Sequence, residues 1–129
     1  MLAIDTNVVV RYLTGDDPEQ SAKAREFIDN QPVFVATTVL LETEWVLRSA
    51  RGYGADRLAR ALAAFAGLPT VILENPTVAR AALDAMARGL DFADALHLAA
   101  ASHCEALVTF DRAFAKGATA LDGIPVRTP

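Results

Sequence analysis

Residues 2–7 read Leu-Ala-Ile-Asp-Thr-Asn, a short apolar run that ends in an acid and two residues that commonly cap helices. Further short apolar runs follow at residues 32–36, 70–73, 106–110 and 124–127. Segments rich in Ala and Leu, which favour helix, separate these runs. Apolar strands that alternate with helices predict an α/β fold in which helices cover both faces of a parallel sheet.

The length and composition fit one compact domain over residues 1–129. Hydrophobic residues make up 53% of the chain, which is enough for a substantial core. Cys104 is the only cysteine, which excludes an intrachain disulfide and a cysteine-based zinc site. Because polar residues interrupt every apolar run and the N-terminus carries no basic leader, we expect no membrane segment and a cytoplasmic location.

The overall charge counts against a simple nucleic-acid-binding protein. Asp and Glu number 16 and Lys and Arg number 12, so the net charge is −4 at pH 7. Phosphate contacts usually require a basic face. Acidic side chains that converge on divalent cations reverse this argument, because the bound metal attracts phosphate.

Two acids directly follow apolar runs of the predicted sheet. Asp5 follows the first run and Asp111 follows the fourth. Ligands of open parallel sheets bind at the carboxyl ends of the strands, so both side chains are candidates for a functional site. The alternative is a local role, because Asp commonly begins turns and caps helices.

Glu42 lies within a helix that we predict over residues 39–50, with Thr38 as its cap. Its neighbours at helical spacing are apolar, namely Val39, Trp45 and Val46. We expect Trp45 in the core and Glu42 on the same apolar face. A carboxylate in such surroundings requires a partner from elsewhere in the fold, and a metal ion would serve.

Glu44 in the same helix has a simpler interpretation. Arg48 lies four residues further on, which favours an ion pair on the solvated face of the helix. We therefore leave Glu44 out of the candidate site.

Asp94 lies one turn into a helix that we predict over residues 91–103, whose composition is apolar on nearly every side. Asp91 stands at the N-cap position, where its side chain can bond the first free amides. No Lys or Arg is close to Asp94 in sequence, so the helix dipole or a bound cation must stabilise its charge. We interpret His97 as a structural polar residue and His103 as a charge near the helix C-terminus.

The four candidates are all carboxylates, and this donor set suits Mg²⁺ or Mn²⁺, which prefer oxygen ligands. Such ions activate a bound water and stabilise a leaving oxygen in phosphodiester hydrolysis. Without metal, carboxylates held close together repel, which raises the pKa of one or more of them. Spacing alone leaves open whether one or two ions bind.

Two other functions fit parts of the pattern. A phosphohydrolase could use Asp5 as a nucleophile, but such enzymes need a second acid two residues on, and position 7 is Asn. A catalytically silent scaffold that binds RNA or protein is the non-enzymatic alternative. Four acids without a local partner count against a scaffold, because uncompensated buried charge destabilises a fold.

Four segments resemble, in order, the acidic motifs of PIN domains, and specifically of VapC-type toxins from bacterial toxin–antitoxin pairs. They are Ile-Asp-Thr-Asn-Val at 4–8, Val-Leu-Leu-Glu-Thr-Glu-Trp-Val-Leu at 39–47, Asp-Phe-Ala-Asp-Ala-Leu-His at 91–97 and Thr-Phe-Asp-Arg-Ala-Phe at 109–114. Each motif alone is weak, but four in order over nearly the whole chain are specific.

The resemblance implies a three-layer α/β/α sandwich around a parallel sheet of four or five strands. It implies a Mg²⁺- or Mn²⁺-dependent endoribonuclease whose metal ligands are Asp5, Glu42, Asp94 and Asp111. Asp111 is the least secure of these, because the fourth acid varies in this family. The expected partners are the RNA substrate, a cognate antitoxin protein and a second copy of the chain in a homodimer.

Overall fold

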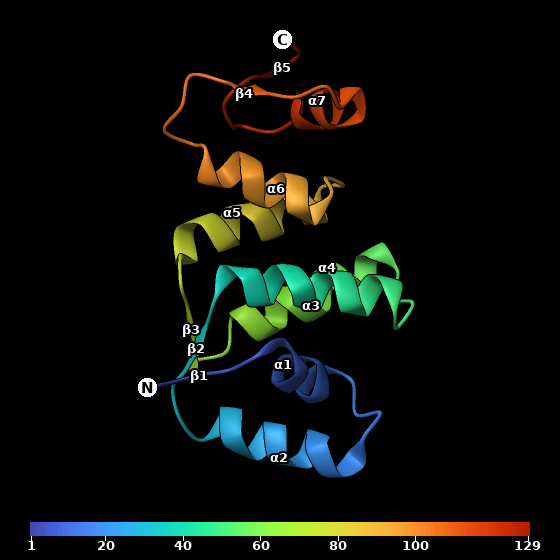
Figure 1. The fold of residues 1–129 in the computed structure, drawn as a ribbon, viewed down its shortest axis with the longest axis vertical. Coiled ribbons are helices and arrows are strands. Elements are labelled where there is room, and N and C mark those ends of the chain that lie inside the picture. The colour runs from blue at the N-terminus through green and yellow to red at the C-terminus, as the bar shows by residue number, and fades with distance from the viewer. The chain divides into compact units, whose positions relative to one another are not determined.

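The computed structural model describes residues 1–129, which form two compact units. The N-terminal unit comprises Met1–Pro76 and the C-terminal unit comprises Thr77–Pro129. Together they contain five strands and seven helices, labelled along the chain in Figure 1.

The N-terminal unit is built on a three-stranded parallel sheet in the order β1-β2-β3. Its strands are β1 (Leu2–Ala3), β2 (Val33–Val35) and β3 (Val71–Leu73). Two helices connect each pair of strands: α1 (Thr6–Leu13), α2 (Pro18–Asp29), α3 (Thr37–Ser49) and α4 (Ala55–Ala66). These are the strand and helix positions that the apolar periodicity predicts for this half of the chain.

The core of the N-terminal unit lies between this sheet and its helices. Val33 and Val35 of β2 are fully buried, whereas Phe34 between them is half-buried, as the alternation of side chains along a strand requires. The helices contribute further side chains that are nearly or fully buried, namely Ile28, Leu40, Leu47, Leu62 and Phe65. Apolar packing against the helices thus stabilises the sheet. The polar residues that follow the strands are not part of this core.

The first amide of α3 is capped by a residue distant in sequence. Thr37 N donates to Glu74 Oε1 at 2.9 Å, and Ala36 at the N-cap position offers no side-chain acceptor. Glu74 reaches α3 because its own amide bonds Val35 O and so extends the β2–β3 pairing. The prediction that Thr38 caps this helix is wrong, since Thr38 lies inside the first turn with its side chain exposed.

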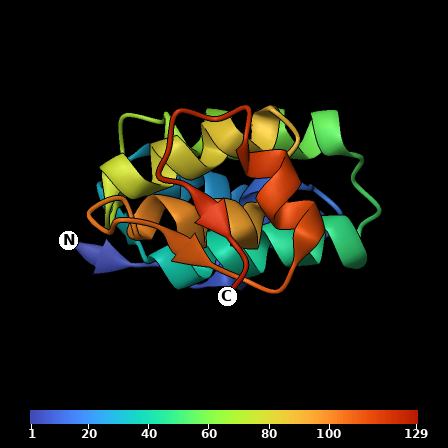
Figure 2. The same cartoon turned by 90° about the horizontal axis from the view of Figure 1, so that it is seen from above.

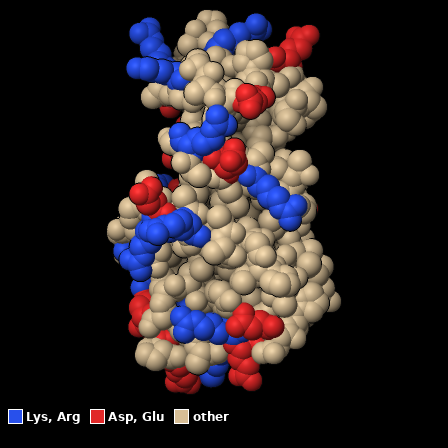
Figure 3. Space-filling model, turned by 180° about the vertical axis from the view of Figure 1, so that it is seen from behind, with Lys and Arg blue, Asp and Glu red and all other residues tan.

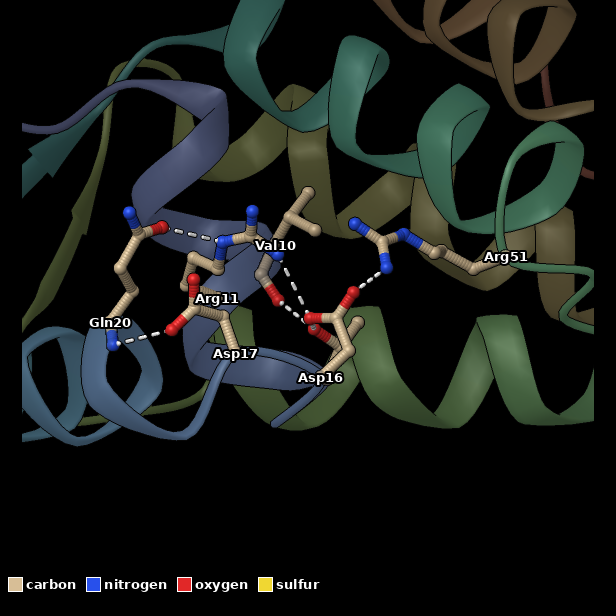
Figure 4. Close-up of polar contacts among 7 residues, drawn as sticks. Val10, Arg11, Asp16, Asp17, Gln20 and Arg51 are labelled. Carbon is tan, nitrogen blue, oxygen red and sulfur yellow. Dashed lines mark hydrogen bonds and ion pairs between the residues drawn. The ribbon is translucent and has the colours of Figure 1, made fainter.

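A polar network joins the end of α1 to α2 and to the residues after α3 (Figure 4). Arg11 Nε donates to Gln20 Oε1 at 2.8 Å, and Arg11 Nη1 donates to Asp16 Oδ1 at 3.0 Å. Arg51 forms an ion pair with the second oxygen of Asp16. Gly15, with φ of +77°, makes the turn that presents Asp16 to both guanidinium groups.

The C-terminal unit pairs two short parallel strands beside helices, seen together in Figure 2. Its elements are α5 (Pro76–Ala87), α6 (Phe92–Ala100), β4 (Leu107–Val108), α7 (Arg112–Ala118) and β5 (Val126–Arg127). Leu107 pairs with Val126, and α7 packs against β5. The side chain of Phe114 anchors α7 in a buried position.

The predicted fold class is confirmed: helices accompany parallel strands in an α/β arrangement. The five strands are divided into sheets of three and two, where a single sheet of four or five was expected; β1, β4 and β5 have only two residues each and offer few ladder hydrogen bonds. Helix α7 was not predicted, because it is short and contains Gly117. The single domain over residues 1–129 stays a prediction. None of the helices is long and apolar enough to cross a membrane.

Candidate active site

Asp5 lies just after β1 and begins α1. Ile4 N donates to Phe34 O and so extends the strand pairing up to the residue before Asp5. The side chain of Asp5 caps the helix, with Oδ1 accepting from Thr6 N at 2.7 Å. Capping engages one carboxylate oxygen, and because Asp5 is exposed the other oxygen faces solvent. The cap and a ligand role are therefore compatible.

Glu42 lies in the second turn of α3 and is exposed. The buried face of this helix follows a helical period, with Leu40, Thr43, Glu44 and Leu47. Glu42 and Trp45 project from the opposite face, and Trp45 is 57% exposed. The expectations that Trp45 is core and that Glu42 lies on a buried apolar face are wrong, because apolar residues occur all around α3 and the packing selects the other face.

Glu44, not Glu42, is the buried acid of α3. Its side chain is 4% exposed and pairs with Arg48 Nε at 3.1 Å. The predicted ion pair is confirmed, but its placement on the solvated face is wrong. The pair lets the carboxylate enter the core because the guanidinium of Arg48, which is half-exposed, compensates the charge.

Asp91 is the N-cap of α6, and Asp94 lies in the first turn of that helix. Asp91 Oδ2 accepts from Asp94 N at 3.2 Å, which confirms that Asp91 caps the helix. Burial raises the pKa of Asp94 above its usual value, and the charges of Asp91 and Asp111 raise it further. His97, one turn along and exposed, lowers this pKa. His103 lies beyond the last residue of α6, so it is not in the final turn of that helix.

Asp111 follows β4 and begins α7. Its Oδ1 accepts from Phe114 N at 3.1 Å, and its own amide donates to Thr109 Oγ1 at 3.0 Å. The side chain of Asp111 is exposed, and these two bonds hold it at the junction of strand and helix. Asp5 and Asp111 thus repeat one arrangement, an acid that follows a strand and caps the next helix.

Within the C-terminal unit, the charge of Asp111 contributes to the raised pKa of Asp94, after burial and the charge of Asp91. Asp91 thus influences Asp94 through its charge as well as through the helix cap, which is the only role that the sequence predicted for it. In the N-terminal unit no hydrogen bond or ion pair links Asp5 to Glu42. Within neither unit do three or more His, Cys, Asp or Glu side chains form a group arranged to hold a metal ion. Metal ligation by the four acids stays a prediction.

The donor chemistry nevertheless fits a divalent cation of the Mg²⁺ type. All the candidate ligands are carboxylates, the donors that such ions prefer. Burial first, and then the charges of Asp91 and Asp111, raise the pKa of Asp94, and a bound cation would favour its charged form. The residues present are thus compatible with a divalent cation of the kind that many phosphodiester-cleaving enzymes use.

A groove of about 580 Å³ in the N-terminal unit begins beside Asp5. Its floor is apolar, with Val8 and Phe27 among the side chains, and Arg11 and Lys23 contribute positive charge at its edges. On the face drawn in Figure 3, Lys and Arg side chains lie among Asp and Glu side chains and form no continuous basic stripe. A polyanion bound here would depend on local cations rather than on the overall field of the protein.

Comparison with known proteins assigns this arrangement to a family. The family model described as PIN domain matches residues 2–119, which include all four candidate acids. No curated protein matches the sequence of the chain.

Proposed function

The chain belongs to the PIN domain family, and on that premise we propose that it is a metal-dependent endoribonuclease and the toxin of a toxin–antitoxin pair. PIN domains are generally metal-dependent nucleases. The observation that carries the proposal is the match of the family model to residues 2–119, a range that includes all four candidate acids. Resemblance of the four acidic motifs to VapC-type toxins supports the narrower assignment to RNA and to a toxin.

Asp5, Glu42, Asp94 and Asp111 would hold Mg²⁺ or Mn²⁺. The metal, when bound, supplies an activated water and neutralises charge on the phosphodiester. We propose that this water attacks the phosphodiester directly, without a covalent enzyme intermediate.

The chain's own contribution is to orient the carboxylates. Asp5 and Asp111 each give one oxygen to a helix amide, which fixes the direction of the other oxygen. Thr109 restrains the backbone of Asp111 through its hydroxyl oxygen. Asp94 is half-buried in the first turn of α6, and burial raises its pKa. Such preorganised ligands reduce the reorganisation that metal and substrate binding require.

The proposal extends to partners that the motif resemblance supports. We propose that a cognate antitoxin protein inhibits the enzyme and that the chain forms a homodimer. Co-expression with the neighbouring reading frame, followed by size-exclusion chromatography with light scattering, measures both associations. A monomer that copurifies with no protein would contradict them and leave the nuclease assignment intact.

The nuclease activity is tested by incubating a mixed RNA pool with the purified protein in Mn²⁺ and in chelator. The same reactions are run with the variant Asp94→Asn. We expect metal-dependent cleavage at discrete sites that is lost in the variant while the variant stays folded. Asp84→Asn is the matched control, because Asp84 is an exposed acid of the same unit whose only ion pair, with Arg88, is long at 3.8 Å. Cleavage by Asp94→Asn at normal metal dependence would refute the assignment, and no cleavage by any folded form would point to a non-catalytic scaffold.

A further inference from the structure

The groove beside Asp5 is formed entirely by the N-terminal unit. Its walls come from β1, α1 and α2, and its volume is about 580 Å³. A second hollow of about 380 Å³ shares Lys23 and Phe27 with it and extends to Asn30 and Gln31. Helix α2, which lines both hollows, has 12 residues and rises by roughly 18 Å. The two hollows together, which we call the α2 groove, thus form an elongated surface that suits an extended chain.

The charged side chains of the groove beside Asp5 reverse the overall charge of the protein. They are Asp5, Arg11 and Lys23, so Asp5 is the only acid among them. In the whole chain, Asp and Glu outnumber Lys and Arg by 16 to 12. The second hollow adds one acid, Glu26. Apart from the proposed metal ligand, the groove beside Asp5 therefore presents only positive charge, which complements phosphate.

Both cations have acidic partners, but these partners do not line the groove. Lys23 Nζ lies 3.3 Å from Glu19 Oε1, and the two side chains are 75% and 80% exposed. An ion pair this exposed contributes little stability, so a phosphate can replace the carboxylate. Arg11 donates to Gln20 through Nε and to Asp16 through Nη1, which orients the guanidinium and leaves Nη2 for a ligand.

The uncharged lining suits nucleobases. Val8 and Phe27 belong to an apolar floor, and Phe27 is half-buried, so part of its side chain is accessible from the groove. Aromatic faces accept any base, and stacking adds affinity to that of phosphate contacts. The side-chain amides of Asn7 and Gln20 offer donors and acceptors to base edges. Stacking surfaces in a groove with cations are the means by which proteins bind single-stranded nucleic acid.

We propose that the α2 groove binds the single-stranded RNA next to the cleaved phosphodiester, with Arg11 and Lys23 on phosphates and Phe27 stacked on a base. The inference rests on the proposed nuclease function and adds a substrate-binding surface whose three residues lie outside the acidic motifs. An apolar peptide would use the floor alone. An RNA strand uses the floor, the cations and the continuity of the groove with Asp5.

Removal of the Lys23 charge is the first test, and Arg25→Gln is the matched control. Arg25 is an exposed cation of the same helix that does not line the α2 groove, so both variants change the net charge equally. The probe is a short fluorescein-labelled single-stranded RNA of mixed sequence. Its anisotropy is measured with Asp94→Asn, so that the RNA is not cut.

The expected effect follows from the salt dependence of phosphate contacts. One contact to a single strand contributes about 0.7 to the slope of log affinity against log salt, which is about 5-fold in affinity at 0.1 M salt. Lys23→Gln should therefore weaken RNA binding about 5-fold and reduce the slope by about 0.7. Arg25→Gln should leave the slope unchanged, because it removes no contact.

Substitution of Phe27 tests the stacking separately from charge. Phe27→Leu keeps an apolar side chain without the ring and should weaken binding about 5-fold, the lower end of the range for one base–aromatic stack. Its salt slope should equal that of the parent, and Phe27→Tyr should retain most of the affinity. Thermal unfolding verifies that each variant is folded. In the metal-loaded enzyme, Lys23→Gln and Phe27→Leu should raise KM more than they lower kcat.

The outcomes distinguish this inference from the function on which it rests. Metal-dependent cleavage, with RNA affinity and KM unchanged in Lys23→Gln and Phe27→Leu, would overturn the RNA-binding role of the groove and leave the nuclease standing. Absence of both RNA binding and cleavage by the folded protein would remove the proposed function and this inference with it. Loss of antitoxin binding in these variants, with RNA binding intact, would assign the α2 groove to a protein partner and overturn its RNA role.

Discussion

The start of α3, the helix that carries Glu42 and Trp45, depends on a cap that crosses from another strand. Glu74 Oε1 accepts from Thr37 N at 2.9 Å. The perturbation of choice is Glu74→Ala, which removes the acceptor and the negative charge together. Glu74→Gln keeps an acceptor oxygen and removes only the charge.

The expected cost follows from the two contributions of this side chain. Loss of a capping acceptor destabilises a protein by about 0.5–2 kcal/mol, and a negative charge at a helix N-terminus contributes about 0.3–1 kcal/mol. Because Glu74 is exposed, solvent screens the charge, and the lower part of each range applies. We expect Glu74→Ala to lower the free energy of unfolding by about 1 kcal/mol, and Glu74→Gln by a few tenths.

Urea unfolding followed by circular dichroism measures these changes, with thermal unfolding as a second assay. A loss of about 1 kcal/mol corresponds to a Tm lower by roughly 3–6 °C for a chain of this size. Thr38→Ala is the matched control and should change stability by less than about 0.5 kcal/mol, because Thr38 is exposed and makes no capping bond. A loss of about 1 kcal/mol in Thr38→Ala, with Glu74→Ala unchanged, would refute the long-range cap.

Three further results are expected. Burial and the charges of Asp91 and Asp111 raise the pKa of Asp94 in the folded, metal-free protein, so its ionisation opposes folding. In the presence of chelator, the free energy of unfolding should therefore decrease as pH rises through that pKa. Urea unfolding of Asp94→Asn should not show this decrease. Equal pH profiles for the two proteins would contradict the prediction. Mn²⁺ at 100 times its Kd should stabilise the native protein by about 2.7 kcal/mol and Asp94→Asn by much less, as measured by Tm. Leu47→Ala empties a fully buried position of α3 and should cost about 2–5 kcal/mol in urea unfolding, whereas a cost below about 1 kcal/mol would mean that this face is not packed.

Much of the local structure could be predicted from the sequence, because its signals are local. The five strands coincide with short apolar runs, and Asp17, Pro18 and Asp91 mark helix starts through contacts within one turn. The positions of Asp5 and Asp111 directly after apolar runs also placed them at strand ends. Each of these inferences depends on residues within a few positions of one another.

The orientation of α3 was decided only by tertiary packing. Apolar side chains occur on every side of this helix, so periodicity could not distinguish the face with Leu40 and Leu47 from the face with Trp45. Packing of α3 against α1 and α4 buried Glu44 and left Trp45 exposed, the reverse of what sequence spacing indicated. The same limit applies to Glu74, whose capping bond spans 37 residues.

The acidic motifs identify the candidate residues, since each carboxylate stands out against its own neighbours in the sequence. Which acids act on one another is a tertiary property. The charge of Asp111 raises the pKa of Asp94, and no local pattern in the sequence encodes that influence. Electrostatic interaction depends on distance in space and on burial, whereas the sequence specifies only distance along the chain.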